Sequence, residues 1–312
     1  MLRRWTPTRR PPDVRALITG ASGFVGRHLA RHLEDLGDDV IGTDRSDGGP
    51  DLLDAEGLEK LLVDLSPEVV YHLAGDADVG GSWDHPLETF RANAEGTLNV
   101  LAAARAAGVG RVLSIGSADV YGIVPAEDLP ITEETPLRPV SPYAASKVAA
   151  EYLALQAWLG REQDVVCVRA FNHIGPGQSE RFVAPAVAMR IVRTEREGGE
   201  LVAAGNLTPR RDVTDVRDVV RAYRMLVTSG RPGTIYNVCS GTAYSIAELC
   251  DMLVANASRP LRIEADPDLQ RPVDLPVLVG DHSLITEHTG WEPEIPIERS
   301  LRELLEECRT RP

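Results

Sequence analysis

Short apolar runs alternate with longer amphipathic stretches through the first half of the chain. Runs of this length suit buried strands, and the stretches between them have the spacing of surface helices. The predicted strands are 16–19, 40–43, 69–73, 111–115 and 165–169, and the predicted helices are 55–65, 86–107 and one that begins at Ser141. Strands that alternate with helices in this way predict a Rossmann-like, doubly wound parallel α/β sheet, with a ligand site at the carboxyl ends of its strands.

Three glycines, Gly20, Gly23 and Gly26, separate the first predicted strand from the first helix. Gly20 allows the tight turn, Gly23 lets the backbone approach a pyrophosphate, and Gly26 lets the helix pack on the strand. The helix N-terminus then offers free N–H groups to the phosphates. A plain tight turn is the alternative, but the strand before and the helix after favour a dinucleotide site.

After about Phe171 the alternation becomes looser. The predicted helices here are 183–197, 216–228, 245–256 and 297–308, and the predicted strands are 201–203, 235–238 and 261–263. We therefore expect residues 1–12 to form a loose N-terminal arm and 13–171 a dinucleotide-binding Rossmann domain. Residues 172–312 should form mainly a smaller substrate-binding lobe that is interleaved with the sheet.

Composition narrows the choice of partners and compartment. The 312 residues carry a formal charge of −14, which argues against nucleic acids and anionic membranes as partners. We find neither an apolar run long enough to span a membrane nor a signal-peptide pattern. Four cysteines without paired spacing predict reduced thiols in a cytoplasmic protein, and the scattered histidines predict no metal.

Tyr143 and Lys147 lie one turn apart in the helix that begins at Ser141, so we expect them on one face. An ammonium group there favours the phenolate and should lower the tyrosine pKa from about 10 toward working pH. Such a tyrosine can exchange a proton with an alcohol or a carbonyl. The alternative is an ordinary surface pair, but Lys60 is the only other lysine of the chain. Ser117 follows the fourth strand and can hydrogen-bond the same substrate oxygen.

Together these features resemble the extended short-chain dehydrogenase/reductase family, or NAD-dependent epimerase/dehydratase family, which acts on nucleotide sugars. Further likeness lies in His72, Leu73, Ala74 and Gly75, in Ser82, Pro86, Asn93, Gly96, Thr97 and Asn99, and in Arg211, Asp212 and Val213. The resemblance covers nearly the whole chain beyond the N-terminal arm. It implies NAD(H) or NADP(H) as cofactor and Ser117, Tyr143 and Lys147 as catalytic residues. The implied cofactor contacts are Gly20, Gly23, Phe24, Val25, Gly26, Asp44, Arg45, Asp51, Leu52, Leu73, Ala74, Tyr143 and Lys147.

Within this family, the segment 169–178 most resembles the GDP-4-keto-6-deoxy-D-mannose reductases, as do 211–218, 236–241 and 269–272. In that subfamily NAD(P)H reduces the 4-keto sugar to GDP-D-rhamnose. The resemblance implies substrate contacts from Asp119, Asn172, Arg211 and Arg271. It places the two arginines at the pyrophosphate, where guanidinium groups suit phosphate oxygens. Surface ion pairs are the alternative for both arginines.

Two departures keep alternative reactions open. Ala118 stands where sugar-nucleotide dehydratases carry an acid, and Asp119 is one methylene shorter than their usual base, so dehydration is less favoured. Asp44 at the end of the second strand suits ribose hydroxyls and slightly favours NAD(H), whereas Arg45 beside it favours a 2′-phosphate. A retained NAD would suit a 4-epimerase, which is the main alternative to the reductase. A non-catalytic NAD(P)-binding regulator is an alternative of another class.

The alanine-rich helices 86–107 and 142–159 carry apolar side chains at Leu98, Leu101, Tyr152 and Leu153. Small residues allow helices to approach closely, and the resemblance implies that two such pairs form a four-helix bundle in a homodimer. The alternative is that these faces only cover the sheet.

Overall fold

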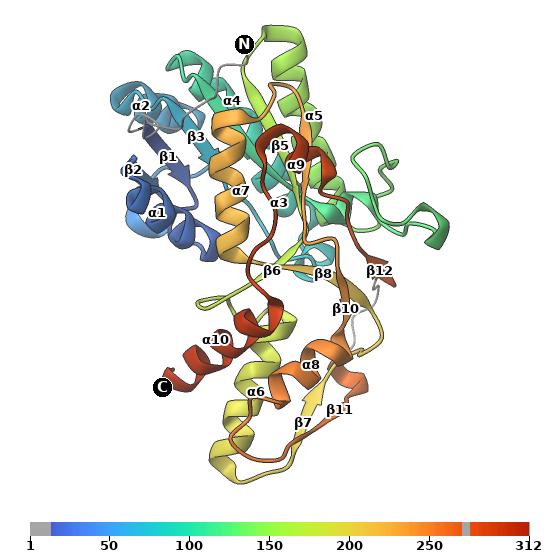
Figure 1. The fold of residues 1–312 in the computed structure, drawn as a ribbon. Coiled ribbons are helices and arrows are strands. Elements are labelled where there is room, and N and C mark those ends of the chain that lie inside the picture. The colour runs from blue at the N-terminus through green and yellow to red at the C-terminus, as the bar shows by residue number, and fades with distance from the viewer. Residues whose placement is uncertain (1–13, 270–274, 312) are drawn as a thin grey trace, which may run out of the picture.

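The computed structural model describes residues 14–269 and 275–311, which form two lobes (Figure 1). The predicted arm, residues 1–12, and Arg271 lie outside the described residues. The larger lobe is a six-stranded parallel sheet in the order β2-β1-β3-β4-β5-β9. Its strands are β1 (Arg15–Thr19), β2 (Asp39–Thr43), β3 (Val69–His72), β4 (Arg111–Ser117), β5 (Val165–Ala170) and β9 (Ile235–Val238).

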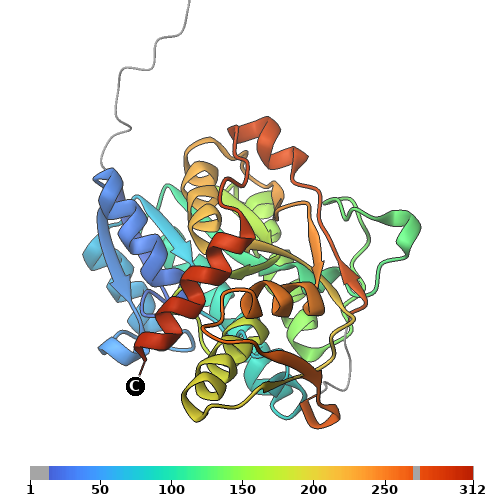
Figure 2. The ribbon, with the colours of Figure 1, turned by 60° about the horizontal axis from the view of Figure 1, so that its bottom comes forward.

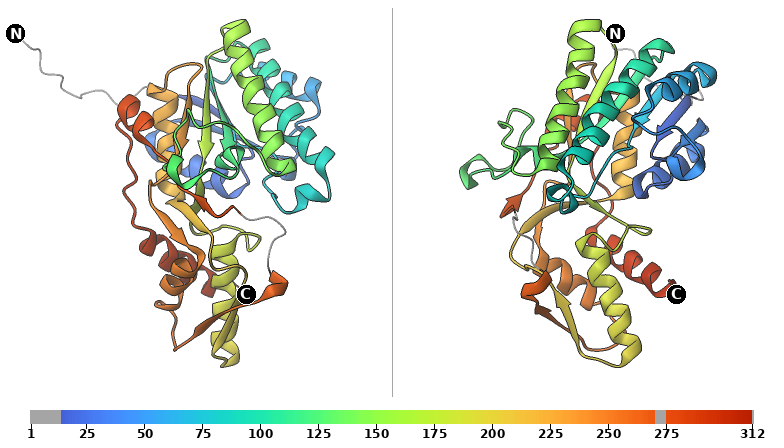
Figure 3. Two further views of the ribbon diagram at one scale, coloured as in Figure 1. Left: turned by 90° about the vertical axis from the view of Figure 1, so that its right-hand side faces the viewer. Right: turned by 180° about the vertical axis from the view of Figure 1, so that it is seen from behind.

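Helices cover both faces of this sheet. α1 (Phe24–Leu36) and α7 (Val216–Ser229) lie on one face, and α2 (Ala55–Leu65), α4 (Gly96–Ala106) and α5 (Pro142–Arg161) lie on the other (Figure 3). Strand β1 explains why the apolar runs are continuous. Ala16 and Ile18 pack among residues of α1 and α7, whereas Leu17 packs among residues of α2 and α4. The doubly wound α/β prediction is confirmed, since a strand buried on both faces needs apolar side chains at every position.

The smaller lobe has its own apolar core. Its helices are α6 (Val183–Glu197), α8 (Ile246–Val254) and α10 (Ile297–Thr310), which pack against one another (Figure 2). Beside them β7 (Leu201–Ala204) pairs with β11 (Arg262–Ala265) in parallel. Val187, Leu249 and Leu301 lie in this core and are almost fully buried.

A small second sheet lies between the two lobes (Figure 1). Its central strand β8 (Arg210–Asp215) pairs with β6 (Asn172–Ile174), β10 (Ala243–Ser245) and β12 (Val277–Leu278). These four strands were not predicted from the sequence, and neither was α9 (Ser283–Thr289), which packs against α7 and β9. The chain thus returns to the larger lobe through α7, β9 and α9 after it has entered the smaller one.

The helix predicted over 86–107 is interrupted, so that prediction was wrong in detail. The structure has α3 (Pro86–Phe90), a π-helical turn over Arg91–Glu95, and then α4. Asn93 lies in the π turn, and its carbonyl oxygen accepts a hydrogen bond of 2.6 Å from the Thr97 hydroxyl. Such turns often occur at functional sites. Among the described residues, no helix is both long and apolar enough to cross a membrane.

Candidate active site

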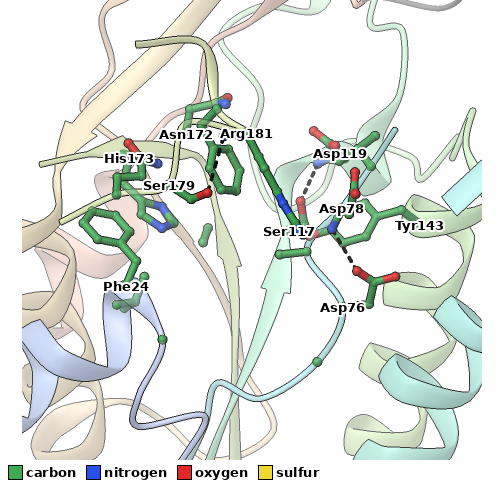
Figure 4. A pocket seen from close by; sticks show the side chains of 18 of the residues that line it. Phe24, Asp76, Asp78, Ser117, Asp119, Tyr143, Asn172, His173, Ser179 and Arg181 are labelled. Carbon is green, nitrogen blue, oxygen red and sulfur yellow. Dashed lines mark hydrogen bonds between the residues drawn. The ribbon is translucent and has the colours of Figure 1, made fainter. Parts of the chain in front are cut away.

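A cavity of about 1410 Å³ lies between the lobes at the carboxyl ends of β1, β3, β4 and β5 (Figure 4). Every predicted site residue that the structure describes lines it. These residues are Gly20, Gly23, Phe24, Val25, Gly26, Asp44, Arg45, Asp51, Leu52, Leu73, Ala74, Ser117, Asp119, Tyr143, Lys147, Asn172 and Arg211. Their placement brings the predicted groups together, and the role of each stays a prediction.

Gly20 and Gly26 in the turn after β1 lie too close to neighbouring backbone to carry side chains. Gly20 has a positive φ of 74°, and a Cβ there would come within 2.9 Å of the Ala74 backbone. A Cβ on Gly26 would collide with the backbone of Gly20 and Ala21. Gly23 is the N-cap of α1 and provides no side-chain cap, so the first N–H groups of the helix remain available to a pyrophosphate. This part of the cavity fits a dinucleotide.

Asp44 lies at the end of β2, where it can meet an adenosine ribose. Its Oδ1 accepts hydrogen bonds of 3.1 Å from both the backbone N–H and the hydroxyl of Ser46. Burial raises the pKa of Asp44, but hydrogen bonds from Ser22 and Ser46 outweigh it and hold that pKa below its usual value. Arg45 points to Asp51, with an Nη1–Oδ2 distance of 3.0 Å. The carboxylate is therefore charged at neutral pH, and the neighbouring guanidinium is already paired.

The predicted catalytic groups meet where β4 ends and α5 begins (Figure 4). The Ser141 hydroxyl caps α5 by accepting a hydrogen bond of 3.1 Å from the Ala144 N–H. Tyr143 is buried and hydrogen-bonds Ser117 at the end of β4. The Lys147 Nζ lies 5.9 Å from the centre of the Tyr143 ring and donates to the Ile115 carbonyl oxygen at 3.3 Å.

The pKa of Tyr143 departs from its usual value in the direction opposite to our prediction. Burial raises this pKa well above 10, and the carboxylates of Asp119 and Asp76 raise it further. The hydrogen bond with Ser117 offsets only part of this. Burial lowers the pKa of Lys147 to about 8, against the opposing effect of Asp76. The prediction of a lowered tyrosine pKa is therefore wrong for this structure, because it took no account of burial or of the two carboxylates. At neutral pH the phenol keeps a proton that it can donate.

Asn93 braces the catalytic helix against the loop after β3. Its Oδ1 accepts from the Asp76 N–H at 2.9 Å, and its Nδ2 donates to the Ser146 hydroxyl at 2.9 Å. Ser146 in turn donates to the carbonyl oxygen of Tyr143 at 2.6 Å. The π-helical turn thus connects the loop after β3 to the backbone of Tyr143.

The smaller lobe closes the other side of the cavity. Asn172 begins β6 and is exposed, and Arg211 donates from Nη1 to the carbonyl oxygen of Leu275 at 2.6 Å. The next residue, Asp212, is fully buried and accepts backbone hydrogen bonds from Ser240, Gly241 and Gly280. Arg211 thus lines the cavity, and Asp212 holds the backbone of Ser240, Gly241 and Gly280 together behind it.

Several charged residues that line the cavity were not predicted from the sequence. Asp76 and Asp78 follow β3, while Arg181 and Arg190 come from the segment that contains α6. Arg190 also donates to the carbonyl oxygen of Ala203 at 3.1 Å. The helical spacing of the sequence could have predicted Arg190, because it lies on the same face of α6 as Val183 and Val187, which also line the cavity. Within residues 14–269 and 275–311, no cluster of His, Cys, Asp or Glu is suited to hold a metal ion.

Comparison with known proteins agrees with this geometry. The sequence profile of the NAD dependent epimerase/dehydratase family matches residues 16–239. The chain belongs to this family. The predicted family is thereby confirmed, and with it the prediction of an NAD(P)-dependent class of enzyme.

Three relatives show how far the similarity extends. The chain is 40% identical over 299 residues to GDP-6-deoxy-D-mannose reductase of Pseudomonas aeruginosa, which covers 95% of this chain and 98% of that protein. A structure described as RMD from Pseudomonas aeruginosa complexed with NADPH has a TM-score of 0.86, with 38% identity, 95% of this chain and 100% of that chain covered. The UDP-glucose 4-epimerase of Thermus thermophilus in complex with NAD has a TM-score of 0.84, with 29% identity and coverage of 95% and 99%.

Proposed function

We propose that this protein is a nucleotide-sugar 4-reductase, which uses NAD(P)H to reduce the 4-keto group of GDP-4-keto-6-deoxy-D-mannose to GDP-D-rhamnose. The observation that carries this proposal is the 40% identity to GDP-6-deoxy-D-mannose reductase over nearly the full length of both chains. The protonated phenol of Tyr143 supports it, because reduction of a ketone needs a proton donor at the carbonyl oxygen.

The cavity residues divide into two groups by their place. The glycine turn and the first N–H groups of α1 would hold the pyrophosphate of the cofactor, and Asp44 would accept hydrogen bonds from a ribose. When bound, the reduced cofactor supplies a hydride to carbon 4. Arg211 from the smaller lobe would hold the substrate diphosphate, and Arg271, outside the described residues, is proposed for the same role.

Tyr143 then donates its proton to the oxygen on carbon 4, and Ser117 hydrogen-bonds that same oxygen. The ammonium group of Lys147 stabilises the phenolate that remains after the transfer. We place Asp119 and Asn172 against the sugar, since both line the cavity and Asp119 lies near Ser117 and Tyr143 (Figure 4).

A 4-epimerase is the second candidate, because the same three residues can serve it and the fold is close to the Thermus thermophilus epimerase. A 4,6-dehydratase is less favoured, since Ala118 is buried and has no acid to offer for loss of water. A non-catalytic regulator would have no use for Ser117, Tyr143 and Lys147 at one point of the cavity.

Stoichiometry with the wild-type enzyme separates reductase from epimerase. We expect one NAD(P)H to be consumed per GDP-4-keto-6-deoxy-D-mannose reduced, with the hydride label at carbon 4. Mass spectrometry of the sugar and the loss of absorbance of the reduced cofactor measure this. Interconversion of 4-epimeric sugars by enzyme with retained NAD, without net consumption of cofactor, would instead make the protein an epimerase.

Asp44 is proposed to set the preference for NADH. Replacing Asp44 with alanine should raise kcat/KM for NADPH relative to NADH, because the change removes a carboxylate that repels a 2′-phosphate. The matched control is Asp47→Ala, which removes the same charge three residues later at a position that is not part of the cavity lining. If the wild-type enzyme already prefers NADPH strongly, Arg45 dominates and this role of Asp44 is wrong.

A homodimer through a four-helix bundle is proposed from the exposed face of α3, α4 and α5 (Figure 3). Leu98 is 46% exposed and Tyr152 is 61% exposed, and Leu87, Phe90 and Leu159 lie exposed on the same helices. Leu101, by contrast, is buried against the sheet.

The four cysteines are free and buried, which supports a reducing compartment such as the cytoplasm.

Light scattering at micromolar concentration should give the mass of a dimer, and Leu98→Glu should give a monomer. Val63 on α2 is 48% exposed, so Val63→Glu adds the same charge to a comparable site outside the bundle. The control variant should remain a dimer. A monomeric wild-type protein would contradict the proposed assembly.

A further inference from the structure

A buried ion pair lies behind the catalytic groups and takes no part in the reaction proposed above. Arg169 near the end of β5 and Glu151 on α5 have side chains that are only 4% and 3% exposed. The guanidinium donates from Nε and Nη2 to the two carboxylate oxygens at 2.8 and 2.7 Å. This two-point contact fixes the relative orientation of the strand and the helix.

The remaining nitrogen of Arg169 reaches a different part of the chain. Its Nη1 donates to the Tyr121 hydroxyl at 2.8 Å and to the Glu133 carbonyl oxygen at 3.0 Å. The guanidinium also lies 4.8 Å from the centre of the Tyr121 ring. The Tyr121 hydroxyl in turn donates to Oδ1 of Asn237 on β9 at 2.7 Å. One buried cation therefore organises four segments.

Two of these segments carry the catalytic groups. Glu151 lies on the same face of α5 as Tyr143 and Lys147, about two turns after Tyr143 and about one turn after Lys147. Tyr121 ends the short 3-10 turn Ala118–Tyr121, which begins directly after Ser117. Arg169 thus holds the helix that bears the phenol and the turn that follows the serine at a fixed separation.

Stability alone gives a poor reason for this arrangement. A buried ion pair usually contributes little compared with apolar residues of the same size, because both charges lose their hydration. The contacts fix geometry instead, and an error of about 1 Å at a reaction centre can cost about 10²-fold in rate.

We propose that Arg169 is a positioning residue, which sets the separation of Ser117 from Tyr143 through Tyr121 on one side and Glu151 on the other. The proposal deepens the function proposed above and rests on it for the kinetic part of its test. Arg169 does not line the cavity, and it acts only through the two segments that it joins.

The chain offers a matched control for a test by substitution. Arg111 at the start of β4 donates from Nε and Nη2 to the two carboxylate oxygens of Asp164 at 2.9 and 2.8 Å. Its Nη1 donates to three backbone carbonyl oxygens. Arg111 lies at the amino end of the sheet, so it has the same kind of contacts at the edge away from the cavity. Arg169→Lys and Arg111→Lys each keep the charge and lose the two-point contact.

We expect Arg169→Lys to lower kcat about 10- to 100-fold, with the dissociation constant of the cofactor unchanged. Arg111→Lys should leave kcat within about twofold, although it too lowers the melting temperature. Equal kcat losses in the two variants would overturn the proposal, as would an unchanged kcat in Arg169→Lys. If Arg169→Lys does not fold, Tyr121→Phe removes one contact of Arg169 and should still lower kcat severalfold, and an unchanged kcat there would overturn it.

A second measurement does not depend on turnover. Tyrosine labelled with ¹³C at Cζ gives few signals in a chain with 7 tyrosines, and Tyr143→Phe assigns one of them. The Tyr143 signal should shift in Arg169→Lys, because its hydrogen bond with Ser117 changes, and should stay in place in Arg111→Lys. Absence of that shift overturns the positioning role even if the wild-type enzyme reduces the sugar. Failure of the wild-type enzyme to reduce the sugar overturns only the proposed reaction.

Discussion

Replacing Tyr143 with phenylalanine should lower the rate of sugar reduction by about 10²- to 10⁴-fold and leave cofactor affinity nearly unchanged. Phenylalanine keeps the ring and its packing but removes the proton that the oxygen on carbon 4 must receive. Steady-state kinetics with GDP-4-keto-6-deoxy-D-mannose measures the loss, and the fluorescence of bound reduced cofactor measures the affinity.

The control for this variant lies two and a half turns along the same helix. Tyr152 is exposed, so Tyr152→Phe removes the same hydroxyl from α5 at a site remote from the cavity. It should leave kcat unchanged. Equal activity of Tyr143→Phe and the wild-type enzyme would show that another group supplies the proton, and the proposed mechanism would then fail.

The sequence allows the cavity to be predicted because its motifs stand directly after strands. The glycine turn follows β1, Leu73 and Ala74 follow β3, and Ser117 ends β4. Since parallel strands end at one edge of the sheet, residues far apart in the chain are brought to one place. Regular periodicity likewise predicts long helices such as α6, whose bounds agree with the predicted 183–197.

Other features depend on contacts that no local pattern contains. The strands of the second sheet have two to six residues each, and their pairing with β8 joins segments that are distant in sequence. In the π-helical turn, the Asn93 side chain bonds Asp76 and Ser146, which are distant from it in the sequence. The pKa of Tyr143 follows from burial and from carboxylates on two loops, and so the i, i+4 spacing to Lys147 could not predict its direction.

Replacing Asp38 should lower the stability of the fold by a large amount, because this residue pairs with Arg224, 186 positions further along the chain. Asp38 precedes β2 and Arg224 lies on α7, and their side chains are 2% and 5% exposed. The carboxylate accepts from the Arg224 Nε at 2.8 Å and from the Val14 N–H at 3.0 Å. Asp38→Ala would leave a buried guanidinium without its counter-charge, so the free energy of unfolding should fall by about 3–5 kcal/mol.

Urea unfolding followed by circular dichroism measures this change. The control is the exposed pair of Arg193 and Glu180, whose side chains are 59% and 42% exposed. Arg193→Ala should change the free energy of unfolding by less than about 1 kcal/mol, because water screens that pair. The double variant Asp38→Leu with Arg224→Met should recover most of the stability, since no buried charge is then left unpaired. If Asp38→Ala costs no more than Arg193→Ala, the buried pair does not hold α7 to the sheet.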